Sequence, residues 1–219
     1  MSYCLPHGYV ARMPAVAFDD HEKIDQSGVT YQPDVYSLAA VVARHASQNF
    51  IVDLGCGSAL KSLKAARYVI GFDIESNVET LINKHGTTLQ SSDKGEVNGH
   101  QWYAVNFERD LNWVSCVPSK SVVVCADVLE HLVTPDNLLA GIASLVNDKD
   151  CTLILSTPDR MLAKTNRMGP PANPRHCREW TLSELVRLLG QFGIDCELSF
   201  HTRNHDQRHC LRSTITVVA

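Results

Sequence analysis

Apolar and polar positions alternate along the chain with two different periods. Short apolar runs, each followed by a small or polar residue, predict buried strands at 50–54, 68–72, 101–105, 121–126 and 151–155. Segments with apolar residues three and four positions apart predict helices at 33–46, 58–67, 76–85, 135–146 and 181–192. Two more strands are expected at 195–202 and 213–219. This alternation predicts an α/β fold, with a doubly wound, mostly parallel sheet covered by helices on both faces.

Local signals set the ends of several of these elements. Thr181 followed by Glu184 is a capping-box pattern that opens a helix, and Thr134 is the expected N-cap of the helix before it. Residues 1–31 contain repeated turn formers, so they are expected to be an irregular segment. We therefore expect a single domain over residues 1–219, preceded only by this irregular segment.

Composition narrows the class of protein. The hydrophobic content of 44% and charged content of 20% are those of an ordinary globular protein. A net charge of −4 argues against a broad basic face, so nucleic acid is an unlikely partner. We expect no membrane span, since the chain lacks a long apolar run, and no signal peptide. The eight scattered cysteines are expected to be reduced thiols of a cytoplasmic protein.

The most informative stretch is Phe-Ile-Val-Asp-Leu-Gly-Cys-Gly-Ser-Ala at 50–59. A strand carrying Asp53 turns through Gly55 and Gly57 into a helix, and the next strand ends in Asp73. The glycines let the backbone approach a ligand, and a carboxylate at a strand tip can accept hydrogen bonds from two ribose hydroxyls. The pattern therefore predicts half of a nucleotide-binding α/β domain.

The spacing of the glycines restricts the ligand further. Leu60 stands where a dinucleotide fingerprint needs a small residue, and no Gly-Lys-Ser/Thr of a Walker loop is present. The remaining pattern resembles the first motif of the class I S-adenosylmethionine-dependent methyltransferases, Asp-x-Gly-x-Gly-x-Gly. Asp53, Gly55 and Gly57 match that motif, and Ala59 takes the place of its third glycine. Alanine is tolerable there if its backbone φ is negative.

The resemblance extends along most of the chain. Asp127-Val128-Leu129-Glu130-His131-Leu132 is similar to the family motif Asp-Val-x-Glu-His-Leu. By resemblance the fold is a Rossmann-like seven-stranded sheet whose last strand is antiparallel, and the cofactor is S-adenosyl-L-methionine. The resemblance places Asp73 and Asp127 beside the cofactor, with Asn106 at the adenine amino group and the backbone N–H of Phe107 at a ring nitrogen.

The reaction site is expected beyond the carboxyl ends of the strands, where ligands bind in such sheets. Glu130, His131 and His176, the last in a proline-rich segment, are the expected catalytic residues, with one histidine as general base. The alternative is that Glu130 and His131 only hold that segment in place. Residues expected to bind the acceptor are Tyr31, Arg160, Asn173 and Arg178.

The favoured prediction is transfer of a methyl group to an oxygen, or a nitrogen, of a small molecule or saccharide. A second possibility follows from similarity to small-RNA 3′-terminal 2′-O-methyltransferases, which carry Glu-x-x-Glu-His and a later His-x-Phe-Glu-Trp-Thr. In that alternative Asp127, Glu130, His131 and His176 bind a divalent metal that gathers a substrate diol. A third alternative is a non-catalytic protein that binds S-adenosylmethionine, which Ala59 and Asn106 would permit.

Overall fold

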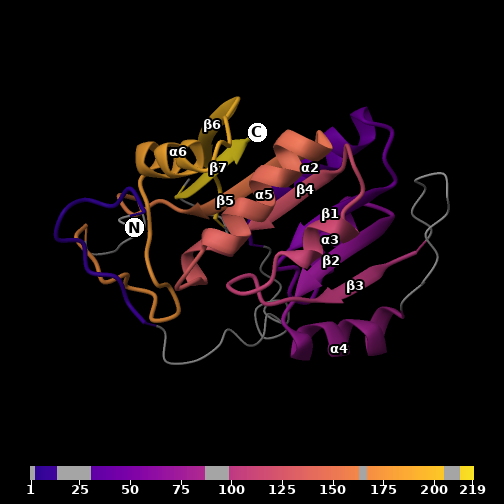
Figure 1. The fold of residues 1–219 in the computed structure, drawn as a ribbon. Coiled ribbons are helices and arrows are strands. Elements are labelled where there is room, and N and C mark those ends of the chain that lie inside the picture. Colours follow the sequence, from indigo (N-terminus) through magenta and orange to yellow (C-terminus); the bar gives the residue numbers. More distant parts are fainter. Residues whose placement is uncertain (1–2, 14–30, 87–98, 163–166, 205–212) are drawn as a thin grey trace.

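The molecule is built on a twisted seven-stranded sheet with the order β3-β2-β1-β4-β5-β7-β6 (Figure 1). A computed structural model of the chain describes residues 3–13, 31–86, 99–162, 167–204 and 213–219. The strands are β1 (Phe50–Leu54), β2 (Tyr68–Asp73), β3 (Gln101–Ala104), β4 (Val122–Ala126), β5 (Thr152–Pro158), β6 (Leu198–Thr202) and β7 (Thr214–Val218). The helices are α2 (Pro33–His45), α3 (Leu60–Ala65), α4 (Glu75–His85), α5 (Asp136–Lys149) and α6 (Leu182–Gln191), with short 3-10 helices η1 (Asn112–Cys116) and η2 (Leu129–His131).

The direction of the strands confirms the predicted fold class. Strands β1 to β5 pair in parallel, with crossover connections between them. The last strand, β7, inserts between β5 and β6 and runs antiparallel to both. The carboxyl ends of β1 to β5 therefore meet at one edge of the sheet, which is where a ligand site is expected in an open α/β sheet.

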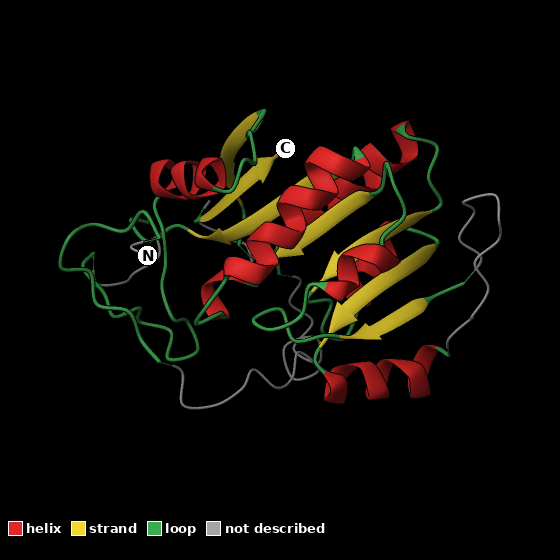
Figure 2. Cartoon of the chain, viewed as in Figure 1, coloured by secondary structure: helices red, strands yellow, loops and turns green. Residues whose placement is uncertain are grey.

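Alternate residues of the central strands pack into separate layers on the two faces. Val52 and Leu54 of β1 point into the cluster that includes α5, whereas Ile51 points into the cluster with α2. Figure 2 shows α5 lying across one face of the sheet. Both β1 and β4 are buried along their whole length, so burial on both faces explains their continuous apolar runs.

The structure corrects some of the predicted boundaries. Thr134 is not the N-cap of α5, because Pro135 takes that position and the Thr134 amide is bonded to the Glu108 carboxylate. Helix α3 begins later than predicted, at Leu60. The capping box of α6 is confirmed: the Thr181 hydroxyl accepts a bond from the Glu184 amide, and the Glu184 carboxylate accepts one from the Thr181 amide.

Other expectations concern the chain as a whole. Residues 3–13 contain no helix or strand, as predicted, while residues 14–30 lie outside the described part. The seven cysteines in the described ranges are all free thiols. In those same ranges no helix combines the length and the apolar character needed to cross a membrane.

Candidate active site

The glycine turn after β1 packs tightly against the segment that follows β4. Gly55 has φ +75°, and a Cβ built on it would lie 2.4 Å from Cγ2 of Val128. Only glycine fits at this position, since both the backbone conformation and the lack of space exclude a side chain. Ala59, by contrast, has φ 56° as the N-cap of α3. The negative φ that would make alanine readily tolerable is not present here: the turn keeps the left-handed backbone that a glycine would adopt, and alanine bears its strain.

The Asp73 carboxylate ties the end of β2 to the glycine turn. Its Oδ2 accepts a hydrogen bond from the Gly57 amide at 2.6 Å, and its Oδ1 accepts from the Ile74 amide at 2.7 Å and the Asn77 side chain at 2.9 Å. Burial raises the pKa of Asp73, and these three donors act against that rise. The two sequence features that predicted a nucleotide site thus lie in direct contact.

Asp53 lies beneath the turn and is almost completely buried. Its carboxylate oxygens accept the Tyr36 hydroxyl of α2 at 3.2 and 3.3 Å. Burial, only partly offset by the neighbouring donors and by the charge of Lys61, raises its pKa to about 6. Tyr36 was not predicted from the sequence, because in the pattern it is only one more buried residue of an amphipathic helix.

Asn106 and Phe107 occupy the turn after β3. The Asn106 side chain is exposed, and its Oδ1 accepts a bond from the Glu108 amide at 3.0 Å. Phe107 is buried against Trp113, with the ring centroids 5.5 Å apart. Asn106 is thus open to solvent at the ligand edge of the sheet, and the contacts of both residues with adenine stay predictions.

Asp127 follows β4 with φ 54° and faces the start of α2. Its carboxylate accepts bonds from the Gln32 amide and, at 3.2 Å, from the Ser156 hydroxyl. Lys61 donates to the other end of the Gln32 amide at 2.8 Å. Burial raises the pKa of Asp127, and the positive charge of Lys61 opposes the rise. Asp127 therefore belongs to a polar network that joins the ends of β4 and β5 to the residue before α2.

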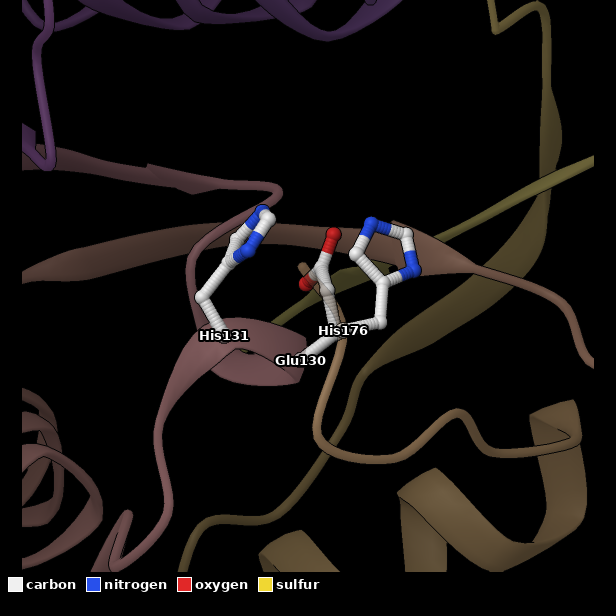
Figure 3. A group of neighbouring side chains, drawn as sticks. All are labelled: Glu130, His131 and His176. Carbon is white, nitrogen blue, oxygen red and sulfur yellow. The ribbon is translucent and has the colours of Figure 1, made fainter. Parts of the chain in front are cut away.

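Glu130, His131 and His176 come together from two distant segments (Figure 3). One ligand atom of each lies within 4.8 Å of the others, and the two imidazole rings are 4.8 Å apart at an angle of 85°. Asp127 is not part of this group, so only three of the four metal ligands predicted in the alternative are brought together. The reason is that the backbone turns at Asp127, which lies outside η2 and does not share its face.

Glu130 is fully buried, and only one of its two carboxylate oxygens has a hydrogen-bond partner among the described residues. Its Oε2 accepts the Thr157 hydroxyl at 2.9 Å, whereas its Oε1 has no hydrogen-bond partner among the described residues. Burial and the nearby Asp127 carboxylate raise the pKa of Glu130 well above its ordinary value. An unsatisfied buried carboxylate oxygen is costly unless a proton, a cation or a substrate donor reaches it.

Neighbouring groups indicate the tautomer of each histidine. Nδ1 of His131 lies 3.0 Å from the Arg175 carbonyl oxygen, and Nδ1 of His176 lies 2.6 Å from Oε1 of Glu179. Both neighbours only accept, so each Nδ1 carries a proton. The Asn173 amide, whose oxygen accepts from the Arg175 amide, directs its NH₂ group to Nε2 of His176 at 2.8 Å. Nε2 is then the basic nitrogen of both rings.

Comparison with known proteins agrees with this geometry. The sequence model of the methyltransferase domain family matches residues 34–198. The chain belongs to this family. It is an S-adenosylmethionine-dependent methyltransferase. No curated protein sequence matches it.

Solved structures share the fold of the methyltransferase at low sequence identity. The methyltransferase domain of a bacterial CtHen1 is 18% identical, with a TM-score of 0.55 over 86% of this chain and 98% of that one. Magnesium protoporphyrin IX methyltransferase from Synechocystis PCC 6803, solved with bound S-adenosylhomocysteine, is 16% identical, with a TM-score of 0.55 over 93% and 89%. The plantazolicin methyltransferase BamL is 13% identical, with a TM-score of 0.51 over 73% and 60%.

The predicted acceptor-binding residues of the methyltransferase occupy different surroundings. Asn173 lies beside His176, and Tyr31 is half-buried just before α2. Arg160 is buried and paired with Glu184 at 2.5 Å. Arg178 donates to the Val133 carbonyl at 2.8 Å and stacks on the Tyr3 ring. The guanidinium groups of both arginines are therefore engaged within the protein, and their roles toward an acceptor stay predictions.

Sequence reasoning missed two groups that shape this half of the methyltransferase. The first group is Glu179, whose carboxylate binds His176. The spacing His-x-x-Glu could have predicted this contact, because two residues three positions apart lie on one side of a turn. The other group is the N-terminal segment 3–12, which contacts the loop that carries His176. Nothing in its irregular sequence pattern marks those contacts.

Proposed function

We propose that the methyltransferase transfers the methyl group to an oxygen of a small molecule or saccharide. The observation that supports this acceptor is the group formed by Glu130, His131 and His176 at the ligand edge of the sheet. A neutral amine can attack with its lone pair, whereas a hydroxyl gains nucleophilicity when a base takes its proton. Three proton acceptors in one place suit a hydroxyl better than an amine.

The residues of the cofactor half have the right chemistry to hold S-adenosylmethionine. The glycine turn exposes backbone N–H groups without side chains, and the Asp73 carboxylate bonded to Gly57 suits a ribose diol. Asp127 offers a negative charge at the same edge, next to the cation of Lys61. The bound cofactor supplies an electrophilic methyl group and a thioether leaving group. Alignment of the acceptor oxygen with that methyl group is then the task of the opposite half.

His131 and His176 are the proposed bases of that half. Each imidazole keeps its proton on Nδ1, so Nε2 is the nitrogen that can receive a proton. At His176 the acceptor hydroxyl would take the place of the Asn173 amide, which donates to Nε2 in this structure. The Glu179 carboxylate and the Arg175 carbonyl fix the ring orientations, so that a proton can be received without rotation of a ring. Glu130 lies beside the two rings and accepts the Thr157 hydroxyl at 2.9 Å, and burial raises its pKa.

Substitution of the histidines tests the proposal. His131→Ala and His176→Ala are each assayed at saturating S-adenosylmethionine against matched alcohol and amine acceptors. The loss of a general base predicts a fall in turnover of about 10²- to 10⁴-fold for alcohols, with unchanged affinity for S-adenosylhomocysteine. His45→Ala, an exposed histidine at the end of α2, is the matched control. Normal turnover in both active-site variants overturns the assignment.

A second candidate is metal-assisted 2′-O-methylation of an RNA 3′ end. Glu130, His131 and His176 have the separation and ligand types of a divalent metal site, and Oε1 of Glu130 is a buried oxygen in need of a cation. The likeness to the methyltransferase domain of CtHen1 concerns the fold and is consistent with this candidate. Against it stand the net charge of −4 and the absence of Asp127 from the group.

Metal removal separates the two candidates. Turnover of a small alcohol that persists in excess EDTA, with no heat of Mn²⁺ binding by calorimetry, supports the first. Turnover that needs Mn²⁺, on an RNA oligonucleotide and not on its 3′-terminal 2′-deoxy counterpart, supports the second. Glu130→Gln is the informative variant, since it keeps the shape of the side chain and removes the charge that a metal needs.

A further inference from the structure

The N-terminal segment 3–12 lies outside the matched family domain and runs beside the loop 167–180. Figure 1 shows the two segments side by side, the N-terminal one in indigo and the loop in orange. The loop carries Asn173, His176 and Glu179 and contains no helix or regular strand. A loop of this kind loses conformational entropy when it is fixed, so other contacts must hold it.

Backbone hydrogen bonds join the two segments at several points. The Val10 amide donates to the Met168 carbonyl at 2.8 Å, and the Arg12 amide donates to the Cys177 carbonyl at 2.8 Å. The Arg12 guanidinium donates to the Pro171 carbonyl at 2.9 Å. The segment therefore contacts the loop both before and after the stretch that turns toward His176.

Cys177 links this segment to the opposite wall of the site. Its carbonyl accepts the bond from Arg12, and its amide donates to the Glu130 carbonyl at 2.7 Å. One peptide unit on each side of Cys177 thus connects the N-terminal segment to η2. The position of the neighbouring His176 depends on both bonds.

Tyr9 reaches the residue that orients His176. The Tyr9 hydroxyl accepts a bond from the Glu179 amide at 3.0 Å, and the Glu179 carboxylate lies 2.6 Å from Nδ1 of His176. The Tyr9 ring also stacks under the Arg160 guanidinium, at 5.1 Å. Glu179 therefore connects Tyr9 to the imidazole. The Tyr9 hydroxyl holds the backbone of Glu179, and the side chain of Glu179 holds the ring.

The fit between the segment and the loop is close at Gly169. A Cβ built on Gly169 would lie 2.1 Å from the Val10 carbonyl oxygen, and Gly169 has φ +71°. No side chain fits there without moving the two segments apart. Gly169 thus marks the position where the contact is most easily broken.

We propose that residues 3–12 are a positioning segment of the active site, which fixes the loop 167–180 and thereby the orientation of His176. Tyr9, Val10 and Arg12 are its positioning residues, and they act through their bonds to the loop. The effect on turnover rests on the proposed function of His176. The effect on the loop does not, so the two can be tested apart.

The test uses point variants in the full chain. Tyr9→Phe removes only the hydroxyl that holds the Glu179 amide, and Gly169→Ala forces the loop away from Val10. We expect faster amide hydrogen exchange over 169–180 in both. Since small misplacements of reacting groups are costly, kcat should fall about 3-fold for Tyr9→Phe and about 10-fold or more for Gly169→Ala.

Two readouts separate positioning from a general loss of structure. Affinity for S-adenosylhomocysteine and exchange in β1 and β2 should stay at the wild-type level, because the cofactor half makes none of these contacts. Met13→Ser, an exposed residue next to the segment, is the matched control and should change neither exchange nor kcat.

Unchanged exchange over 169–180 in both variants overturns the proposal. The proposal also fails if Tyr9→Phe and Gly169→Ala speed up exchange but keep a normal kcat, while His176→Ala inactivates the enzyme. If exchange is faster, kcat is normal and His176→Ala is also fully active, the role of His176 in the proposed function fails, while the hold of the segment on the loop is upheld.

Discussion

The proposed cofactor half of this methyltransferase, around the glycine turn and Asp73, and the proposed acceptor half, around Glu130, His131 and His176, are assembled in different ways. In the first half, Asp73 binds Gly57, only 16 residues away, and the strands that carry these two ends, β1 and β2, are adjacent in the sheet. In the acceptor half, Tyr9 binds Glu179 across 170 residues, and His131 binds Arg175 across 44. The first half is a local motif, and the second is a meeting of separate segments.

This difference has a physical consequence. A local motif is fixed by its own strand, turn and helix, so it forms wherever that supersecondary unit folds. A site made of distant loops depends on every contact that holds those loops, each of which closes a long stretch of chain. Substitutions in the cofactor half should therefore act on cofactor affinity, and substitutions in the acceptor half on turnover and stability.

The largest effect is expected from Asp73→Ala. The change removes the carboxylate proposed to bind the ribose hydroxyls and also the acceptor that holds the Gly57 amide. Two lost charge-assisted hydrogen bonds amount to about 4 kcal/mol, or roughly a thousandfold weaker binding. Calorimetric titration with S-adenosylhomocysteine measures this loss.

A matched variant sharpens the comparison. Asn77→Ala removes only a donor to Asp73, and we expect it to weaken binding less than about tenfold. Hydrogen exchange over 169–180 should be the same as wild type in both variants. Wild-type affinity in Asp73→Ala would show that the glycine turn does not hold the nucleoside as proposed.

The next effect concerns the scaffold of the acceptor half. Arg160 is buried and forms a 2.5 Å ion pair with Glu184, which also caps α6. Arg160→Met leaves this carboxylate buried and unpaired, so the free energy of unfolding should fall by about 3 kcal/mol. Denaturant unfolding measures the change.

Arg203→Met is the control for that prediction. Arg203 pairs with Asp34 at 2.5 Å too, but their side chains are 49% and 32% exposed. Solvent screening limits an exposed pair to about 1 kcal/mol or less. Equal losses in the two variants would contradict the view that burial makes the Arg160 pair structurally important.

The same contrast explains what the sequence could predict. The strands, the sheet direction and the glycine turn were predicted correctly because periodicity and glycine spacing act over short distances, as in the stretch from Asp53 to Asp73. Glu130 and His131 were singled out by their motif. Their meeting with His176 was inferred from topology and is present in the structure.

The features of the site that were not predicted depend on the folded structure, and no local sequence pattern indicates them. Tyr36 on Asp53 and Tyr9 on Glu179 are ordinary tyrosines in the sequence. The left-handed backbone of Ala59 was not predicted either, since alanine favours a negative φ and the geometry of the turn overrides that preference. The two tyrosines reach their partners from other segments, and at Ala59 the turn after β1 sets the backbone conformation.

The pH dependence of stability gives a third test, confined to the cofactor half. The pKa of Asp53 is raised to about 6 by burial, so the folded state holds its proton more tightly than the unfolded state. Between pH 4 and pH 6, a rise in pH therefore lowers stability, and above pH 6 the full cost of the buried charge is present. We expect a cost of up to about 3 kcal/mol at pH 7.5.

Asp53→Asn isolates that contribution. The neutral amide cannot ionise, so stability of the variant should fall less than that of the wild type when pH rises from 5 to 7.5. Denaturant unfolding at the two pH values measures the difference. Identical pH dependence in the two proteins would show that the Asp53 carboxylate stays ionised at little cost in the folded state.

The smallest effect is expected from Ala59→Gly, at the departure from the family motif. Glycine relieves the strain of φ 56°, which costs about 1 kcal/mol for alanine. It also raises the entropy of the unfolded chain and removes a methyl group that is 1% exposed, each worth about 0.5–1 kcal/mol in the opposite direction. These contributions nearly cancel, so stability should change by less than about 1 kcal/mol. Such a result, with unchanged affinity for S-adenosylhomocysteine, would show that burial of one methyl group lets alanine keep the turn geometry of glycine. A loss of more than tenfold in affinity would show instead that the Ala59 side chain itself supports the cofactor.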